Sequence, residues 1–188
     1  MNNKFTNLQG WALFIDRDGV INERLPDDYV KHPDEFQLIQ GVSDAFISLS
    51  AIFNPIIVVT NQQGIGRGLM TSAQLNAVHA KMLQELSAKG GRIDAVFYSP
   101  DLKNTRSFTR KPAVGMGLKA RKQFPSINFK KSFMVGDSYS DILFGHRLGM
   151  TTVLIGTDKE VILKCAGILD YSFPDLISFA GFIEKLSQ

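Results

Sequence analysis

The sequence predicts an α/β fold built on a parallel sheet that helices cover on both faces. Apolar runs of strand length alternate along the chain with amphipathic stretches of helix length. Strands that alternate with helices pair in parallel, because each helix carries the chain back across the sheet. At 188 residues, 44% of them hydrophobic, the chain is long enough for one such domain. We therefore assign residues 1–188 to a single doubly wound domain with no sizeable cap domain.

Five segments are predicted to be buried strands because apolar, β-branched or aromatic residues fill them almost continuously. They are 11–16 (WALFID), 55–60 (PIIVVT), 93–99 (IDAVFYS), 132–137 (SFMVGD) and 151–156 (TTVLIG). Helices are predicted at about 43–52, 72–88, 113–124, 138–148 and 174–186. The second of these has the clearest pattern, since Thr71 and Gln74 form a capping box ahead of an apolar face.

Composition and charge narrow the functional classes. No apolar run reaches the ~18–20 residues of a membrane span, and the start MNNKFTNLQG lacks an export signal. The single cysteine, Cys165, excludes an intrachain disulfide and a multi-cysteine zinc site, and the lack of disulfides fits the reducing cytoplasm.

The net charge is only +3, yet residues 102–136 contain no Asp or Glu. That basic segment is either a solvated face or an attractor of anionic ligands such as phosphate.

Carboxylates gather where the predicted strands end. Asp16 and Asp18 follow the first strand, and residues two apart in an extended chain share a face. Like charges that close need relief from a divalent cation or a shared proton. Asp137 ends the fourth strand and Asp141 follows it, although a helix cap or a first-turn acid would also explain these two. If these strands and the second are neighbours, their ends meet at one crevice, where Mg²⁺ would find the oxygen ligands it prefers.

Two loops could hold phosphate beside these acids. Residues 60–68 (TNQQGIGRG) offer the Thr60 hydroxyl and glycines that let backbone N–H groups approach an anion. Residues 109–117 (TRKPAVGMG) supply Arg110 and Lys111, either as surface cations or as anion ligands. The Gly-Lys-Ser/Thr fingerprint of a nucleotide triphosphatase is missing. The set instead suits phosphoryl transfer through an aspartyl phosphate, with Asp18 as the proton donor and later the base.

These motifs resemble the haloacid dehalogenase (HAD) superfamily of phosphatases. The order Asp-x-Asp-Gly, a strand ending in Thr, a Lys and then Gly-Asp-x-x-x-Asp is met in full. The segments DRDGVIN, VVTNQQGIGRG, RKPAVGM and MVGDSYSDI are most similar to the branch of D,D-heptose 1,7-bisphosphate phosphatase and of the phosphatase part of bifunctional histidinol-phosphate enzymes. The resemblance covers about residues 11–156 and implies a Rossmann-like, HAD-like sheet.

The resemblance also implies roles for the acids. Asp16 would be the nucleophile and Asp18 the general acid and base. Mg²⁺ would bind Asp16, the backbone carbonyl of Asp18 and Asp137, with Asp141 behind these ligands.

Phosphate binding is implied for residues of the two loops. Thr60 and Asn61 would hold the phosphate, Lys111 would orient the nucleophile, and Arg110 would contact the substrate.

Two features depart from the family pattern. Many heptose bisphosphate phosphatases have a Cys/His zinc loop, but residues 98–112 (YSPDLKNTRSFTRKP) contain neither residue, so no zinc is expected. Ser138 stands where close relatives often have lysine.

His32, His79 and His146 show no metal-ligand spacing and are interpreted as structural. Residues 20–40 and 100–110 are expected to shape a crevice that admits a medium-sized phosphate ester.

The leading hypothesis is a Mg²⁺-dependent phosphomonoesterase that removes the 7-phosphate of D-glycero-D-manno-heptose 1,7-bisphosphate. Histidinol phosphate is a second candidate substrate. A nucleic-acid 3′-phosphate is a third, because Phe108, Phe124 and Phe129 interleave the basic segment, although such residues also suit a core. A phosphate-binding module without catalysis is the alternative outside enzymes, and it would have no need of Asp16. Oligomeric state, anomeric preference and the role of the tail beyond 157 stay open.

Overall fold

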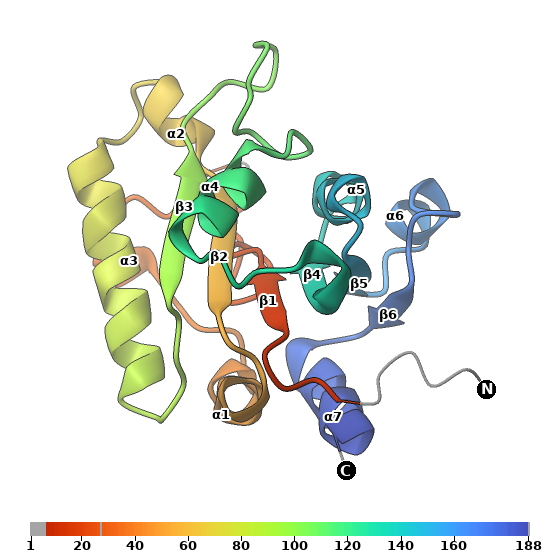
Figure 1. The fold of residues 1–188 in the computed structure, drawn as a ribbon. Coiled ribbons are helices and arrows are strands. Elements are labelled where there is room, and N and C mark those ends of the chain that lie inside the picture. Colours follow the sequence, from red (N-terminus) through yellow and green to blue (C-terminus); the bar gives the residue numbers. More distant parts are fainter. Residues whose placement is uncertain (1–6, 27, 188) are drawn as a thin grey trace.

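The computed structural model describes residues 7–26 and 28–187, and a six-stranded parallel sheet forms its centre (Figure 1). The strands are β1 (Ala12–Ile15), β2 (Ile56–Asn61), β3 (Ala95–Ser99), β4 (Ser132–Gly136), β5 (Thr151–Ile155) and β6 (Tyr171–Phe173). Their order across the sheet is β3-β2-β1-β4-β5-β6, and every neighbouring pair is parallel. Strands β2 and β3 therefore lie on one side of β1, and strands β4, β5 and β6 follow on its other side.

Helices cover both faces of the sheet, as predicted. Three pack on one face, namely α1 (Val42–Ile52), α3 (Ser72–Ser87) and α7 (Leu176–Ser187). The other face is covered by α4 (Gly115–Gln123), α5 (Tyr139–Leu148) and α6 (Lys159–Lys164). Short helical turns complete the set: α2 (Gln63–Gly66), η1 (Pro33–Glu35) and η2 (Phe129–Lys131). Figure 1 shows α3, α1 and α7 on the opposite side of the strands from α4, α5 and α6.

The continuous apolar character of the strands follows from this double cover. In β1, Leu13 and Ile15 enter the core beneath α1 and α7, whereas Ala12 and Phe14 enter the core beneath α4 and α5. All four side chains are buried, because alternate residues of a strand point to opposite faces and both faces are covered. The five strands predicted from such runs are confirmed, each within one or two residues of its predicted ends.

The C-terminal tail holds two elements that the sequence did not indicate. Strand β6 has only three residues and pairs with β5 alone, so it lacks the long apolar run of a central strand. Helix α6 has six residues and is capped at its start by Asp158, whose carboxylate accepts a hydrogen bond from the Glu160 N–H at 2.8 Å. The last helix, α7, covers the sheet, with Phe179 packed on Phe133 at 5.8 Å between ring centroids.

The sheet order brings the polar strand ends together. Strands β2, β1 and β4 are adjacent, so the residues after β1 and β4 and the last residues of β2 meet at one edge. This confirms the predicted convergence at the topological switch point, where ligands bind in such sheets. No helix within the described part of the chain has both the length and the apolar character needed to cross a bilayer.

Candidate active site

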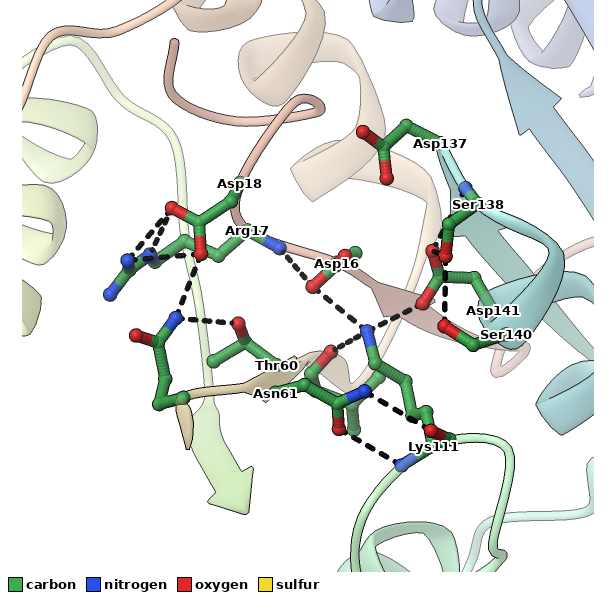
Figure 2. A network of polar contacts seen from close by, with 12 residues as sticks. Asp16, Arg17, Asp18, Thr60, Asn61, Lys111, Asp137, Ser138, Ser140 and Asp141 are labelled. Carbon is green, nitrogen blue, oxygen red and sulfur yellow. Dashed lines mark hydrogen bonds and ion pairs between the residues drawn. The ribbon is translucent and has the colours of Figure 1, made fainter. Parts of the chain in front are cut away.

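Asp16 stands directly after β1 and is almost fully buried. Its Oδ1 accepts a hydrogen bond from the backbone N–H of Arg17 at 2.7 Å and forms an ion pair with Nζ of Lys111 at 2.8 Å (Figure 2). Burial raises the pKa of Asp16 to about 7, Lys111 opposes that rise, and the carboxylates of Asp141 and Asp137 add to it. The pair of donors on Oδ1 leaves Oδ2 as the oxygen without a protein donor among the described residues.

Asp18 does not crowd Asp16 in the way that the two-residue spacing predicts. The strand ends at Ile15, so the alternation of an extended chain does not continue through Asp18. Its carboxylate instead meets the guanidinium of Arg17, with Nη2 at 2.8 Å and 3.0 Å from the two oxygens. Asn22 and Gln62 donate to it as well, at 3.1 Å and 2.8 Å. Burial pushes the pKa of Asp18 upward, but Arg17 and these hydrogen bonds outweigh it and hold that pKa below its usual value.

Arg17 was not singled out in the sequence, yet it is the largest fully buried side chain in the described residues. Its Nη1 lies 3.1 Å from Nε2 of His79 on α3. Burial and the nearby guanidinium lower the pKa of His79 to about 3, so the ring is neutral and accepts the bond at Nε2. His79 therefore has a structural partner, as interpreted. The position of Arg17 between two aspartates, with apolar residues on both sides in LFIDRDGVI, is the signal that could have drawn attention to it.

Asp137 follows β4 and faces Asp16 across the sheet edge (Figure 2). Burial and Asp141 raise the pKa of Asp137 to about 6. Its Oδ2 lies 3.2 Å from Arg24, while its buried Oδ1 has no hydrogen-bond partner among the described residues. A buried, unpaired carboxylate oxygen is costly unless a ligand supplies its partner.

The carboxylate cluster has the composition of a divalent-cation site. Oxygens of Asp16, Asp137 and Asp141 lie within 4.8 Å of one another. Gly19, with φ of +86°, makes the room, since a Cβ on it would lie 2.1 Å from Oδ2 of Asp137. Crowded acids with raised pKa values and an unpartnered oxygen fit a hard cation such as Mg²⁺.

Both carboxylate oxygens of Asp141 contact other protein groups. Helix α5 begins after Ser138, whose backbone N–H and hydroxyl donate to Oδ2 of Asp141 at 3.1 Å and 2.6 Å. Its Oδ1 lies 2.6 Å from Nζ of Lys111. Asp141 thus serves in the first turn of α5, whereas the helix-cap interpretation of Asp137 is wrong because Ser138 is the cap. Capping by Ser138 leaves the Asp137 side chain free to face the cavity.

Lys111 connects these acids to β2. Its buried Nζ contacts Asp16, Asp141 and the carbonyl oxygen of Val59, the last at 2.6 Å. Burial alone would lower the pKa of Lys111, but Asp141 and Asp16 raise it above its usual value, so the amine stays charged. The side-chain amide of Asn61 forms two hydrogen bonds with the Lys111 backbone, at 2.9 Å and 3.1 Å. Asn61 therefore fixes the lysine in place.

Thr60 is also buried, and its Oγ1 accepts a hydrogen bond from Nε2 of Gln62 at 2.9 Å. The hydroxyl proton remains available for a bound anion. Gln62 donates to both Thr60 and Asp18, so it links the second strand to the acid after the first. Gln62 is a second site residue that the sequence did not indicate.

All predicted site residues except the buried Asp141 line one cavity of about 860 Å³. The segments after β1 and β3 form its walls, as predicted, through residues such as Leu25, Tyr29 and Thr105. Helices α5 and α6 contribute further cations that were not predicted, Arg147 and Lys164. The cavity combines the buried carboxylate of Asp16, the ammonium group of Lys111, the carboxylate cluster that could hold a cation, and the carboxylate of Asp18. This set can transfer a phosphoryl group to an acid and then to water.

Known proteins resemble the chain over nearly its whole length. The HAD-hydrolase-like family model matches residues 108–166. The chain is 34% identical to D-glycero-alpha-D-manno-heptose-1,7-bisphosphate 7-phosphatase of Mycobacterium tuberculosis, over 90% of each chain. It is also 34% identical to D-glycero-beta-D-manno-heptose-1,7-bisphosphate 7-phosphatase of Salmonella typhi, over 93% of this chain and 95% of the other. The structure of D,D-heptose 1,7-bisphosphate phosphatase from Bordetella bronchiseptica, complexed with magnesium and phosphate, superposes with a TM-score of 0.84 at 29% identity, covering 93% of this chain and 98% of the other.

Proposed function

Because the chain belongs to the HAD-like hydrolases, among the D-glycero-D-manno-heptose-1,7-bisphosphate 7-phosphatases, we propose that it is a Mg²⁺-dependent phosphatase that removes the 7-phosphate of this sugar bisphosphate. The observation that carries the proposal is the position of Asp16, whose Oδ1 lies 2.8 Å from Lys111 in a cavity shared with Asp137. A sugar phosphate is small enough for the 860 Å³ of that cavity.

Asp16 is the proposed nucleophile. Lys111 and the Arg17 N–H hold Oδ1, which directs the carboxylate and keeps Oδ2 free to attack phosphorus. Attack forms the bond from Oδ2 to phosphorus and breaks the bond from phosphorus to the sugar oxygen. The product is an aspartyl phosphate, which water cleaves in a second step.

Asp18 is the proposed general acid and base. It protonates the leaving sugar oxygen in the first step and accepts a proton from water in the second. Its lowered pKa keeps the Asp18 carboxylate ionised, as the role of proton acceptor in the second step requires. For the first role Asp18 must take up a proton, and the negative charge of a bound phosphate favours this by raising its pKa.

The phosphate is held by groups from the end of β2 and from the segment between β3 and α4. Thr60 donates its hydroxyl proton, and Lys111 places a positive charge beside the transferring group. Asn61, which the resemblance implied as a phosphate ligand, has both ends of its amide bound to the Lys111 backbone and acts instead by fixing Lys111. Arg110, which lines the cavity, contacts the substrate.

The metal would be held by Asp16, Asp137 and the backbone carbonyl of Asp18. When bound, Mg²⁺ neutralises the carboxylate charges and polarises the phosphoryl oxygens. Asp141 supports the site through Lys111 and Ser138. The absence of cysteine and histidine from residues 98–112 supports a site that works without zinc.

The test is phosphate release from purified protein, with and without Mg²⁺. The panel holds both anomers of heptose 1,7-bisphosphate, because relatives of each kind are similar to the chain, and adds histidinol phosphate and a 3′-phosphorylated oligonucleotide. We expect the bisphosphate to be the fastest substrate, and Asp16→Asn to lower kcat at least about 10³-fold, since it removes the nucleophile.

A faster rate on histidinol phosphate or the oligonucleotide would move the assignment to that substrate. Phosphate binding with no turnover by the folded protein would replace the enzyme with a binding module.

A further inference from the structure

Three hydroxyl groups converge on Asp101 in the segment after β3. Its Oδ2 accepts hydrogen bonds from the hydroxyls of Ser99, Ser107 and Thr109, at 3.2 Å from Ser99 and 2.9 Å from Thr109. The Ser99 and Thr109 hydroxyls are also 3.0 Å apart. The bonds from Ser107 and Thr109 hold the pKa of Asp101 below its usual value. We call these four residues the Asp101 cluster, and they join the start of the segment to its end.

One end of the cluster is anchored in the sheet. Ser99 is the last residue of β3 and is fully buried. Its carbonyl oxygen accepts a hydrogen bond from the backbone N–H of Gln62 at 2.7 Å. The position of Ser99 is therefore set by the core, and Asp101 extends that fixed point into the loop.

The other end of the cluster holds Arg110. Oγ of Ser107 accepts hydrogen bonds from the backbone N–H groups of Thr109 at 3.1 Å and Arg110 at 2.7 Å. The carbonyl oxygen of Asp101 accepts a bond from Nη1 of Arg110 at 3.1 Å. Both the backbone and the guanidinium of Arg110 thus depend on the cluster, whereas the next residue, Lys111, is held separately by Asn61.

Packing alone does not hold this segment. Residues 102–106 and Phe108 are exposed, so little apolar burial fixes the loop. The segment also separates two hollows. Thr105 and Ser107 line both the catalytic cavity and a second cavity of about 550 Å³. A thin wall between two cavities can shift unless polar contacts hold it.

We propose that Asp101 is a positioning residue for substrate recognition, which fixes Arg110 in the wall of the catalytic cavity through Ser107. Lys111 reaches inward to Asp16, while the guanidinium of Arg110 is held back along the loop at the Asp101 carbonyl. Arg110 therefore faces the part of a sugar bisphosphate that lies away from the reacting phosphate. The inference rests on the proposed function, and it adds Asp101 as the residue that holds Arg110 in position to contact the substrate.

The test compares Asp101→Asn with Asp44→Asn, which makes the same change in charge at an exposed position of α1. We expect Asp101→Asn to raise KM for heptose 1,7-bisphosphate about tenfold, because an amide is a weaker acceptor for three hydroxyls, with kcat within about twofold. Turnover of p-nitrophenyl phosphate, which has no second anionic group, stays unchanged. Asp44→Asn changes neither substrate's constants.

A second readout does not depend on activity. Amide hydrogen exchange at Thr109 and Arg110 is expected to become about tenfold faster in Asp101→Asn, and at least as much faster in Ser107→Ala, which removes the hydroxyl that accepts both N–H groups. Unchanged exchange and unchanged KM would overturn the proposal. Equal losses of kcat on both substrates would also overturn it, because they would indicate a general structural role. If the wild type hydrolyses none of the phosphate esters, the proposed function fails, while exchange still tests the hold on Arg110.

Discussion

Arg17 stands between two aspartates whose pKa values are shifted in opposite directions. Its guanidinium pairs with Asp18 and keeps that pKa low, whereas its backbone N–H alone reaches Asp16. Burial dominates at Asp16 and raises its pKa to about 7. A buried guanidinium needs partners on each side, and Asp18 and His79 supply them. One residue thus separates the proposed base from the proposed nucleophile.

Gly19 is the residue whose side chain the site cannot accept. In Gly19→Ala the new Cβ would lie 2.1 Å from Oδ2 of Asp137, so that carboxylate must move. We expect Mg²⁺ affinity to fall at least about tenfold, because the ligand is displaced, and phosphatase activity to fall with it. Isothermal titration with Mg²⁺ and a kcat measurement at saturating Mg²⁺ check this.

The control for that substitution is Gly149→Ala. Gly149 also has a positive φ, of +75°, but nothing lies within 4 Å of the position of its Cβ. Both variants carry the backbone strain of about 1 kcal/mol that alanine meets at positive φ. An equal loss of Mg²⁺ affinity in the two variants would show that strain, and not the clash with Asp137, is responsible.

At the scale of elements, the capping box at the start of helix α5 decides where the side chains of Asp137 and Asp141 point. Its capping box is formed by Ser138 and Asp141. A serine at the cap leaves the preceding Asp137 outside the helix and beside Gly19. The same box turns Asp141 toward Lys111. The first turn of one helix therefore orients both acids of the Gly-Asp-x-x-x-Asp motif.

Helix α7 is expected to stabilise the sheet from the face opposite α5. Phe179→Ala removes a fully buried ring that packs on Phe133 and Phe173, and we expect a loss of about 3–5 kcal/mol in the free energy of unfolding. Ile177→Ala, on the same helix but 44% exposed, should lose less than about 1 kcal/mol. Urea denaturation of both variants measures the difference. Similar losses at the two positions would mean that α7 does not pack on the sheet as described.

At the scale of the whole molecule, the carboxylate cluster makes stability depend on pH. In the metal-free protein, the pKa values of Asp16 and Asp137 are about 7 and about 6, against the ordinary 3.8. The folded protein keeps these protons where the unfolded chain has already lost them. The stability associated with both groups is therefore complete below about pH 4 and is lost as the pH rises through about 6 to 7.

We expect the Tm of the metal-free protein to fall by several degrees between about pH 5 and about pH 8. Mg²⁺ should restore stability strongly at the higher pH and weakly at the lower one, because protons compete for the same oxygens. Thermal unfolding in EDTA and in Mg²⁺ across this range measures both effects, and Asp137→Asn should reduce each of them. A Tm that rises with pH in EDTA, or an equal gain from Mg²⁺ at both pH values, would contradict this assignment.

The sequence by itself determined the elements and the chemistry at their ends. Continuous apolar runs marked the five main strands, because a strand covered on both faces has no polar side. The capping box at Thr71 is formed as predicted, with Gln74 donating and accepting. The motifs around Asp16, Lys111 and Asp137 identified the family, since each consists of residues that are close along the chain.

Only the tertiary structure decided which of these residues share a site and what holds them. Arg17 meets His79, and Asn61 meets Lys111, across separations of 62 and 50 residues. Periodicity and motifs describe neighbours within a few residues, so they carry no information on such pairs. The order of the strands across the sheet brought the acids after β1 and β4 together. The physical reason is that a side chain's pKa, partners and reach depend on what the fold packs against it.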